Sequence, residues 1–175
     1  LGVFPILAKG LLGVMKRRRA LAPYQKPKFL DDNLIVIGAG SAGLVASLIA
    51  ATVRARVSLV GRDKMGGDCL NYGCVPSKAL IRSAAFLKQV QTAETLGIAN
   101  ATVDYNFSEV MARVQRVVSA VEPHDSVERY TQLGVEVLQG NARITSPWTV
   151  EVNGQTLTTR AIVIATGARP AVPNI

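Results

Sequence analysis

Three short runs of mostly aliphatic residues, at 34–37, 57–60 and 161–164, mark the chain at wide intervals, and Ser58 is the one polar residue in them. Runs with no polar alternation are typical of strands buried in a parallel sheet, since both faces of such a strand are covered. The first run leads through a glycine-rich turn into an apolar helical stretch over 44–52. This order of strand, turn and helix predicts an α/β fold.

Two further stretches show helical signals. Residues 75–90 form one, with Pro76 in its first turn, where proline is tolerated. Pro123 is expected to bend or end the second, which covers 107–133. The valines of this second stretch recur on one helix face: Val110, Val114, Val117, Val118 and Val121.

The last third of the chain carries strand signals of another kind. A strand is expected over 135–138, and Asn153-Gly154 separates two β-rich segments, 148–152 and 155–159. Asn-Gly between two such segments is a strong hairpin signal. We therefore expect a parallel sheet joined to a β-meander.

The turn after the first strand reads Gly38-Ala39-Gly40-Ser41-Ala42-Gly43, the dinucleotide-binding fingerprint in its required context. Gly38 allows the tight turn, and Gly40 lets the backbone approach a pyrophosphate at the positive end of the helix. Gly43 lets helix and strand pack closely. The alternative, a glycine turn in a plain α/β core, is disfavoured by this context.

The fingerprint normally ends its second strand with an acidic residue that binds the adenosine ribose. Here that position is Gly61, and Asp63 follows two residues later, between Arg62 and Lys64. Either Asp63 turns toward the ribose, or the ribose relies on water and backbone contacts. Loss of a charged hydrogen bond of ~1.5–3 kcal/mol predicts weaker cofactor retention rather than a lost site.

Cys69 and Cys74 are the two cysteines of the chain. A disulfide between them would close a very small loop and contribute little entropic stabilisation. A zinc site would need two further ligands, for which the chain offers His124 and carboxylates, so no metal site is expected. The pair is better suited to switching between dithiol and disulfide, in which a thiolate attacks or donates electrons.

The run from Gly66 to Lys78 fills every fixed position of the pattern G-G-x-C-x-N-x-G-C-x-P-x-K. It resembles the redox-active segment of the flavin-dependent pyridine nucleotide-disulfide oxidoreductases, which include dihydrolipoyl dehydrogenase, glutathione reductase and mercuric reductase. Ala165-Thr166-Gly167 resembles the segment by which that family returns to its FAD site. Gly140-Asn141-Ala142 matches the place where the family's backbone contacts the adenine.

The resemblance implies an FAD/NAD(P)-binding Rossmann-like domain over residues 33–175, which is only part of the family's fold. Since Gly61 lacks the ribose carboxylate, a glutamate there is expected to tighten FAD binding. The resemblance assigns the following residues to the FAD site: Gly38, Gly40, Ser41, Ala42, Gly43, Gly61, Arg62, Gly67, Asp68, Cys69, Cys74, Lys78, Ala142, Ala165, Thr166 and Gly167.

The catalytic residues implied by the resemblance are Cys69, Cys74 and Lys78. NAD(P)H, on a domain absent from this chain, would pass hydride to FAD, which would reduce the disulfide through Cys74. Cys69 would exchange with the substrate, and Lys78 would lie near flavin N5. The substrate would be a small-molecule or protein disulfide, or Hg(II). The alternative function is a membrane-linked flavoprotein that serves as a redox sensor or electron carrier.

The family's chains continue through an NAD(P)H domain, a central domain and an interface domain, so we expect a fragment of a longer homodimeric protein. Their catalytic base is a distant C-terminal histidine that His124 does not match. Tyr72 and Asp68 differ from the residues of many relatives beside the disulfide. The terminal electron acceptor is therefore left open.

Residues 1–15 are apolar apart from Lys9, and a basic cluster follows over 16–19. Such a segment is shorter than the ~20 residues that span a bilayer, but it suits the end of a membrane region with a positive cytoplasmic flank. The motif resembles bacterial mercuric-reductase-like proteins with a DedA-type (SNARE-associated) membrane domain. Alternatively, the N-terminal arm, residues 1–32, forms an amphipathic helix or a loosely ordered segment. In either case residues 20–32 are expected to be a linker. We expect the protein to be located in the bacterial cytoplasm, or at the cytoplasmic face of the inner membrane.

The net charge of +8 raises the question of nucleic-acid binding. Four of the positive charges lie at 16–19, and the others are scattered without interleaved aromatic residues or a known binding module. The pattern therefore indicates no nucleic-acid partner. Anionic lipid is a better partner for the basic cluster, through contact of residues 1–19.

Overall fold

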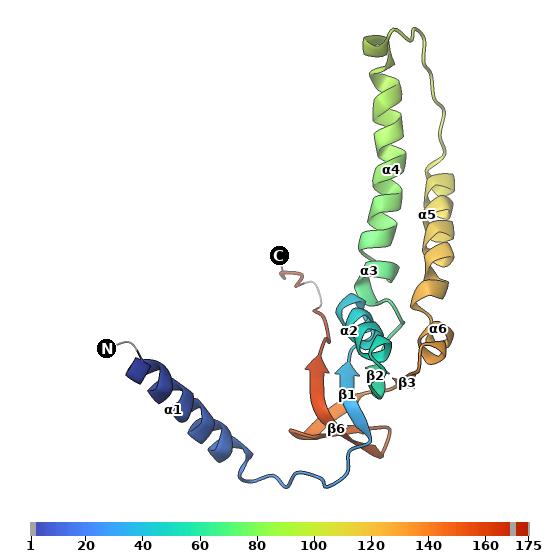
Figure 1. The fold of residues 1–175 in the computed structure, drawn as a ribbon. Coiled ribbons are helices and arrows are strands. Elements are labelled where there is room, and N and C mark those ends of the chain that lie inside the picture. The colour runs from blue at the N-terminus through green and yellow to red at the C-terminus, as the bar shows by residue number, and fades with distance from the viewer. Residues whose placement is uncertain (1–2, 169–170, 175) are drawn as a thin grey trace.

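The computed structural model describes residues 3–168 and 171–174, with side chains from residue 12 onward (Figure 1). Leu1, Gly2 and Ile175, at the ends of the predicted arm and domain, lie outside the described residues. The helices are α1 (Val3–Leu21), α2 (Ser41–Thr52), α3 (Gly67–Asn71), α4 (Cys74–Gln91), α5 (Phe107–Val121) and α6 (Val127–Gln132), with the 3-10 helices η1 (Ala93–Leu96) and η2 (Glu122–Asp125). The strands are β1 (Asp32–Ile37), β2 (Val57–Gly61), β3 (Val135–Gln139), β4 (Ala142–Ser146), β5 (Thr149–Val152) and β6 (Gln155–Ile164).

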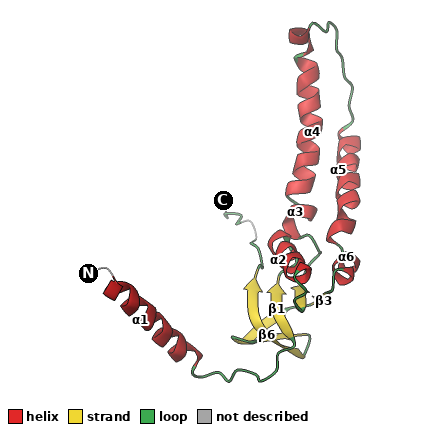
Figure 2. Cartoon of the chain, in the orientation of Figure 1, coloured by secondary structure: helices red, strands yellow, loops and turns green. Residues whose placement is uncertain are grey.

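The six strands form one sheet in the order β3-β2-β1-β6-β5-β4 (Figure 2). Strands β3, β2, β1 and β6 are parallel, whereas β5 and β4 add as antiparallel strands. The predicted α/β fold, a Rossmann-like parallel sheet joined to a β-meander, is therefore confirmed. Asn153 and Gly154 both have positive φ, as the predicted hairpin turn requires.

Strand β6 differs from the prediction, which divided it into separate strands at 155–159 and 161–164. The structure contains one unbroken strand of ten residues. Its first half pairs antiparallel with β5, and its second half pairs parallel with β1, where Ala161 lies opposite Leu34. A single strand thus carries the chain from the meander into the centre of the parallel sheet.

The core lies on both faces of the central strands. Neighbouring residues point to opposite faces, so Val36 and Leu59 join one buried cluster, and Ile35 and Val60 join the other. The first cluster includes Leu44 of α2, Val57, Val135 and Tyr130 of α6, and the second includes the meander residues Val150, Val152 and Leu157. Because both faces are covered, these strands read as continuous apolar runs.

The helix expected over 107–133 is interrupted. Helix α5 ends at Val121, Pro123 lies in the first turn of η2, and α6 begins after Ser126, whose hydroxyl accepts the Arg129 amide at 3.2 Å. The expected effect of the proline is confirmed, and the new cap allows the chain to restart as a helix. Helices α4 and α5 pack together and project beyond the sheet (Figure 1).

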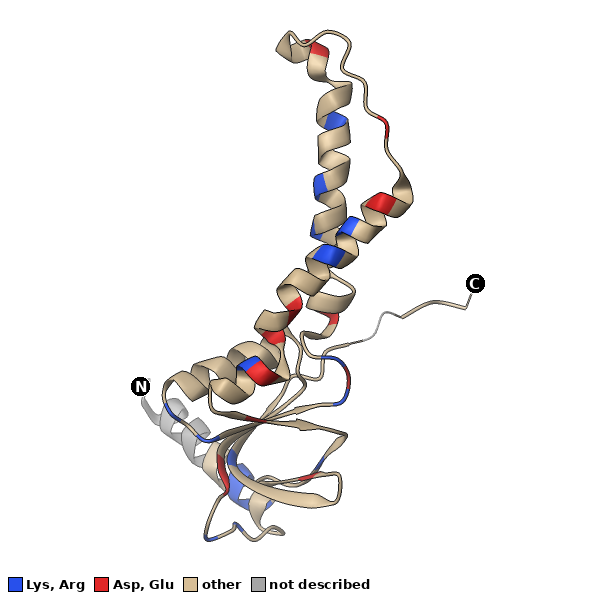
Figure 3. Ribbon diagram, turned by 90° about the vertical axis from the view of Figure 1, so that its right-hand side faces the viewer, with Lys and Arg blue, Asp and Glu red and all other residues tan. Residues whose placement is uncertain are grey.

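The N-terminal arm contains helix α1, which lies apart from the sheet in Figure 1. Its basic residues gather at its C-terminal end (Figure 3), where they meet the negative end of the helix dipole. Within the described part of the chain, no helix combines the length and apolar character needed to cross a bilayer. The origin of residues 1–19 in a membrane domain stays a prediction.

Two adjacent aspartates at the start of β1 lie in opposite environments. Asp32 is buried, and the Ser58 hydroxyl lies 2.7 Å from its Oδ2 and 3.0 Å from Glu136 Oε2. Burial, with the charges of Glu136 and Asp31, raises the pKa of Asp32 against the opposing Ser58 hydrogen bond. Asp31 is exposed, and the Thr158 hydroxyl and amide donate to it at 2.7 and 2.8 Å, which lowers its pKa.

This contrast predicts opposite effects of the same substitution. Asp32→Asn should raise the free energy of unfolding at pH 7, since it removes a buried charge and keeps an acceptor for Ser58. Asp31→Asn should lower it by about 1 kcal/mol or less, since a charged acceptor at an exposed site becomes neutral. Urea denaturation at pH 7 measures both changes.

The pH dependence follows from the direction of each pKa shift. The raised pKa of Asp32 means that stability is lost as pH rises, whereas the lowered pKa of Asp31 means that stability is lost as pH falls. The Asp32→Asn difference from the wild type should therefore shrink as pH falls through the raised pKa of Asp32 and vanish at about pH 4, whereas the Asp31→Asn difference should shrink only below about pH 4. Equal effects of the two substitutions at pH 7 would contradict this account.

Candidate functional site

A groove of about 940 Å³ opens at the carboxyl ends of β1 and β6, beside the N-termini of α2 and α3. This is the edge at which open α/β sheets bind their ligands. The groove is lined by Gly38, Ala39, Gly40, Ser41, Ala42, Arg62, Asp63, Lys64, Gly67, Asp68, Cys69, Asn71, Tyr72, Gln139, Ala165, Thr166, Gly167 and Ala168. Its size suits an extended ligand such as a dinucleotide.

The glycine turn has no space for side chains. Gly38 has φ +112°, and a Cβ there would overlap the carbonyl oxygen of Ala165. A Cβ at Gly43 would overlap the carbonyl oxygen of Gly38. The turn therefore lies directly between α2 and the end of β6, and its backbone forms the floor of the groove.

The N-terminus of α2 presents its backbone amides to the groove. Its N-cap is Gly40, which is extended, and within the described structure no side chain caps these amides. Gly40 pairs with Gly66 in an isolated bridge, and a Cβ at Gly67 would lie only 2.7 Å from the Gly40 Cα. These contacts leave a cradle of backbone amides at a helix N-terminus, which fits the diphosphate of FAD.

Ala39 leaves little space for a side chain at the end of β2. Gly61 is buried, and a Cβ at that position would lie 2.8 Å from the Cβ of Ala39. A glutamate at 61 would therefore require Ala39 to move, and the expected tightening of FAD binding by this residue stays a prediction. No local pattern indicates this contact, which joins two segments 22 positions apart.

The two cysteines lie on either side of a break between α3 and α4. Cys69 is half-buried in α3, and Cys74 is exposed as the first residue of α4. At the break, the amides of Tyr72 and Gly73 both donate to the Asp68 carbonyl, at 2.9 and 2.6 Å. Gly73 thus turns the chain so that both cysteines lie at the junction of the two helices.

The two sulfurs interact as free thiols. The hydrogen bond to Cys69 raises the pKa of Cys74, with smaller contributions from burial and from the charge of Cys69. The backbone amide of Cys74 and the positive charge of Lys78 act in the opposite direction. A helix N-terminus lowers the pKa of a thiol in general, but in this dithiol the neighbouring sulfur outweighs that effect at Cys74.

Asn71 explains one fixed position of the cysteine motif. Its side-chain amide donates to the carbonyls of Met65 at 3.0 Å and Gly67 at 2.8 Å. These bonds hold α3 against the loop that precedes it. The motif pattern contains this asparagine, but its role as an anchor became apparent only from the structure.

The structure distributes the sequence-predicted residues around the groove. Eleven line it: Gly38, Gly40, Ser41, Ala42, Arg62, Gly67, Asp68, Cys69, Ala165, Thr166 and Gly167. Gly43 and Gly61 lie in α2 and β2, Cys74 and Lys78 share one face of α4, and Ala142 begins β4. Seven further lining residues are not in the FAD site assigned from the sequence: Ala39, Asp63, Lys64, Asn71, Tyr72, Gln139 and Ala168. Gln139 could have been found from the sequence, because it lies at the carboxyl end of an expected strand, where α/β sheets bind their ligands.

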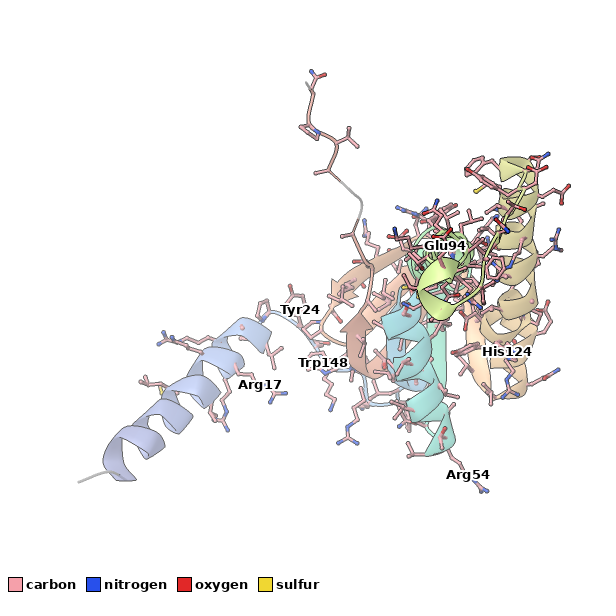
Figure 4. The ribbon with its side chains drawn as sticks, turned by 90° about the horizontal axis from the view of Figure 1, so that it is seen from above. Arg17, Tyr24, Arg54, Glu94, His124 and Trp148 are labelled. Atoms are coloured by element: carbon pink, nitrogen blue, oxygen red, sulfur yellow. The ribbon has the colours of Figure 1, made fainter. Side chains whose placement is uncertain are left out.

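His124 is not among the residues that line the groove. It is exposed in η2, between α5 and α6 (Figure 4). This position agrees with its interpretation as a surface residue.

Comparison with known proteins finds reductases and a dehydrogenase among the relatives of this chain. The chain is 32% identical to a mercuric reductase of Staphylococcus aureus and 37% identical to a dihydrolipoyl dehydrogenase of Mycoplasma pneumoniae, over 83% and 81% of its length. It is 34% identical to a glutathione reductase of Burkholderia cepacia over 83% of its length. It spans only 26%, 31% and 32% of these three relatives, respectively.

The family model described as pyridine nucleotide-disulphide oxidoreductase matches residues 32–175. The match begins at the first residue of β1, leaves out α1 and includes both the groove and the cysteine pair. With its glycine turn, its sheet and its paired thiols in the arrangement described above, the chain belongs to the pyridine nucleotide-disulphide oxidoreductase family.

Proposed function

We propose that the full-length protein passes electrons from NAD(P)H through FAD to the Cys69–Cys74 pair, and from there to a disulfide or Hg(II) substrate. The position of the two cysteines at the junction of α3 and α4, beside a groove large enough for a dinucleotide, is the observation that carries this proposal. The similarity to a mercuric reductase and a glutathione reductase supports it. The NAD(P)H domain and a homodimer partner would lie outside this chain.

The residues of the groove fit FAD. Gly38, Gly40 and Ser41 would hold its diphosphate through backbone amides, and Thr166 and Gly167 would border it from the loop after β6. Bound FAD would supply two-electron transfer between NAD(P)H and the cysteine pair. Lys78 would keep a positive charge beside Cys74, where it favours the thiolate.

The cysteines would exchange with a substrate disulfide in two steps. The Cys69 thiolate attacks one substrate sulfur, forms a mixed disulfide and releases the first substrate thiolate. Cys74 then attacks the Cys69 sulfur, releases the second substrate thiolate and closes the Cys69–Cys74 disulfide. The substrate gains two electrons and two protons, and the oxidised pair needs the same number to return to the dithiol.

The assignment of Cys74 as the sulfur beside the flavin rests on the motif, because Cys69 rather than Cys74 lines the groove. In the FAD-loaded full-length protein, Cys69→Ser should show long-wavelength absorbance without added reductant, since Cys74 is then a permanent thiol. Cys74→Ser should lack this absorbance. Visible spectra of both variants measure the effect, and the opposite pattern would exchange the two roles.

Activity provides a separate test of the same variants. Both should lose disulfide and Hg(II) reduction, because neither can form the internal disulfide. Both should keep some NAD(P)H oxidation by oxygen or a quinone, which needs no cysteine. Full disulfide reductase activity in either variant would remove the pair from the mechanism.

The interaction between the thiols predicts a change in reactivity. In the full-length apoprotein, Cys69→Ala should lower the pKa of Cys74, because it removes the sulfur that raises it. Alkylation of Cys74 by iodoacetamide at pH 7 should therefore become faster. Adding Lys78→Met to this variant should slow the reaction again. A pH–rate profile read by mass spectrometry measures both shifts, and an unchanged profile for Cys69→Ala would contradict the interaction.

Asp68 predicts a preference in substrate charge. Its exposed carboxylate lines the groove next to Cys69 and should disfavour anionic disulfides. Asp68→Asn should raise kcat/KM for oxidised glutathione, an anion, relative to cystamine, a dication. A Coulomb energy of about 1 kcal/mol at the protein surface corresponds to a roughly fivefold change in this ratio. A ratio equal to that of the wild type would show that Asp68 does not select substrates.

A further inference from the structure

The acidic residue that normally ends the second strand cannot be accommodated here. Ala39 is 7% exposed, and its carbonyl accepts the Gly66 amide at 3.0 Å, so its Cβ is held against Gly61. On the other side, the Gly61 carbonyl accepts the Gly140 amide at 2.9 Å, which fixes the strand end. Neither neighbour has room to yield easily to a side chain at position 61.

Asp63 brings a carboxylate to the same end of the groove two residues later. It lines the groove, and Arg62 donates to its Oδ2 from Nη2 at 2.9 Å and from Nε at 3.2 Å. The Lys64 carbonyl accepts the Gly67 amide at 3.4 Å, which ties this loop to α3. Both guanidinium donors meet the same oxygen of this exposed carboxylate, so Arg62 turns that oxygen toward itself.

We propose that Asp63 is the ribose-binding acid of this chain, displaced from the strand end into the following loop because Ala39 occupies the usual space. Its carboxylate would accept hydrogen bonds from the vicinal hydroxyls of the adenosine ribose, and Arg62 would position it. This assignment rests on the proposed function, because it requires an adenine dinucleotide in the groove. It explains how the fold keeps an acidic contact although Gly61 has no side chain.

The proposal is tested by titrating full-length apoprotein with FAD and following the quenching of flavin fluorescence. Asp63→Asn keeps the shape of the side chain and removes its charge, so it should weaken FAD binding about tenfold. The matched control is Asp104→Asn, the same change outside the groove, which should leave the affinity unchanged. Equal affinity of Asp63→Asn and the wild type would overturn the proposal.

Competition between nucleotides identifies the ribose contact itself. ADP should displace FAD from the wild type several-fold more effectively than 2′-deoxy-ADP does. In Asp63→Asn this difference should disappear, because the partner of the missing hydroxyl is gone. A difference that persists in the variant would place the contact elsewhere and overturn the proposal. Failure of the wild type to bind FAD at all would instead refute the proposed function.

The steric part of the argument is tested by moving the acid back. In the Asp63→Asn background, Gly61→Glu together with Ala39→Gly should restore most of the lost FAD affinity, since removal of the Ala39 Cβ opens the strand end. Gly61→Glu without Ala39→Gly should not restore it. Thermal unfolding of each apoprotein shows whether a variant is folded. Full restoration by Gly61→Glu alone in a folded protein would show that Ala39 does not displace the acid.

Discussion

The close contact between the glycine turn and the end of β6 is the constraint on which the site depends. Gly38 leaves no space for a Cβ beneath the Ala165 carbonyl, and Gly43 leaves none beneath the carbonyl of Gly38. Because β1 and β6 are neighbouring parallel strands, this contact fixes where α2 begins. The amides of that helix therefore face the same groove that Thr166, in the loop after β6, also lines.

The redox segment depends on this turn through a second backbone contact. The bridge between Gly40 and Gly66 sets α3 beside α2, and Asn71 holds α3 to the loop before it. Gly73 then breaks the helical path, so that Cys74 starts a new helix beside Cys69. One continuous set of contacts thus positions both the groove and the two cysteines. Such a rigid support keeps the thiols at a fixed place relative to a ligand in the groove.

Electrostatic balance around the cysteines differs from what a helix N-terminus alone would produce. A helix N-terminus and Lys78 both favour a thiolate at Cys74, yet the adjacent Cys69 sulfur shifts its pKa in the opposite direction. The same competition between local and spatial neighbours separates Asp31 from Asp32. In each case the sequence identifies an ionisable residue, but the direction of its pKa shift depends on the groups that the fold packs around it.

The sequence by itself determined the buried strands, the glycine turn, the hairpin at Asn153-Gly154 and the cysteine segment. These features are local, because each is encoded by apolar runs or by fixed spacing within a few residues. Only the tertiary structure decided that β6 is one strand and that Ala39 excludes a side chain at Gly61. It also placed Asp63 on the groove. These outcomes depend on pairing and contacts between segments far apart in the chain, which no local pattern contains.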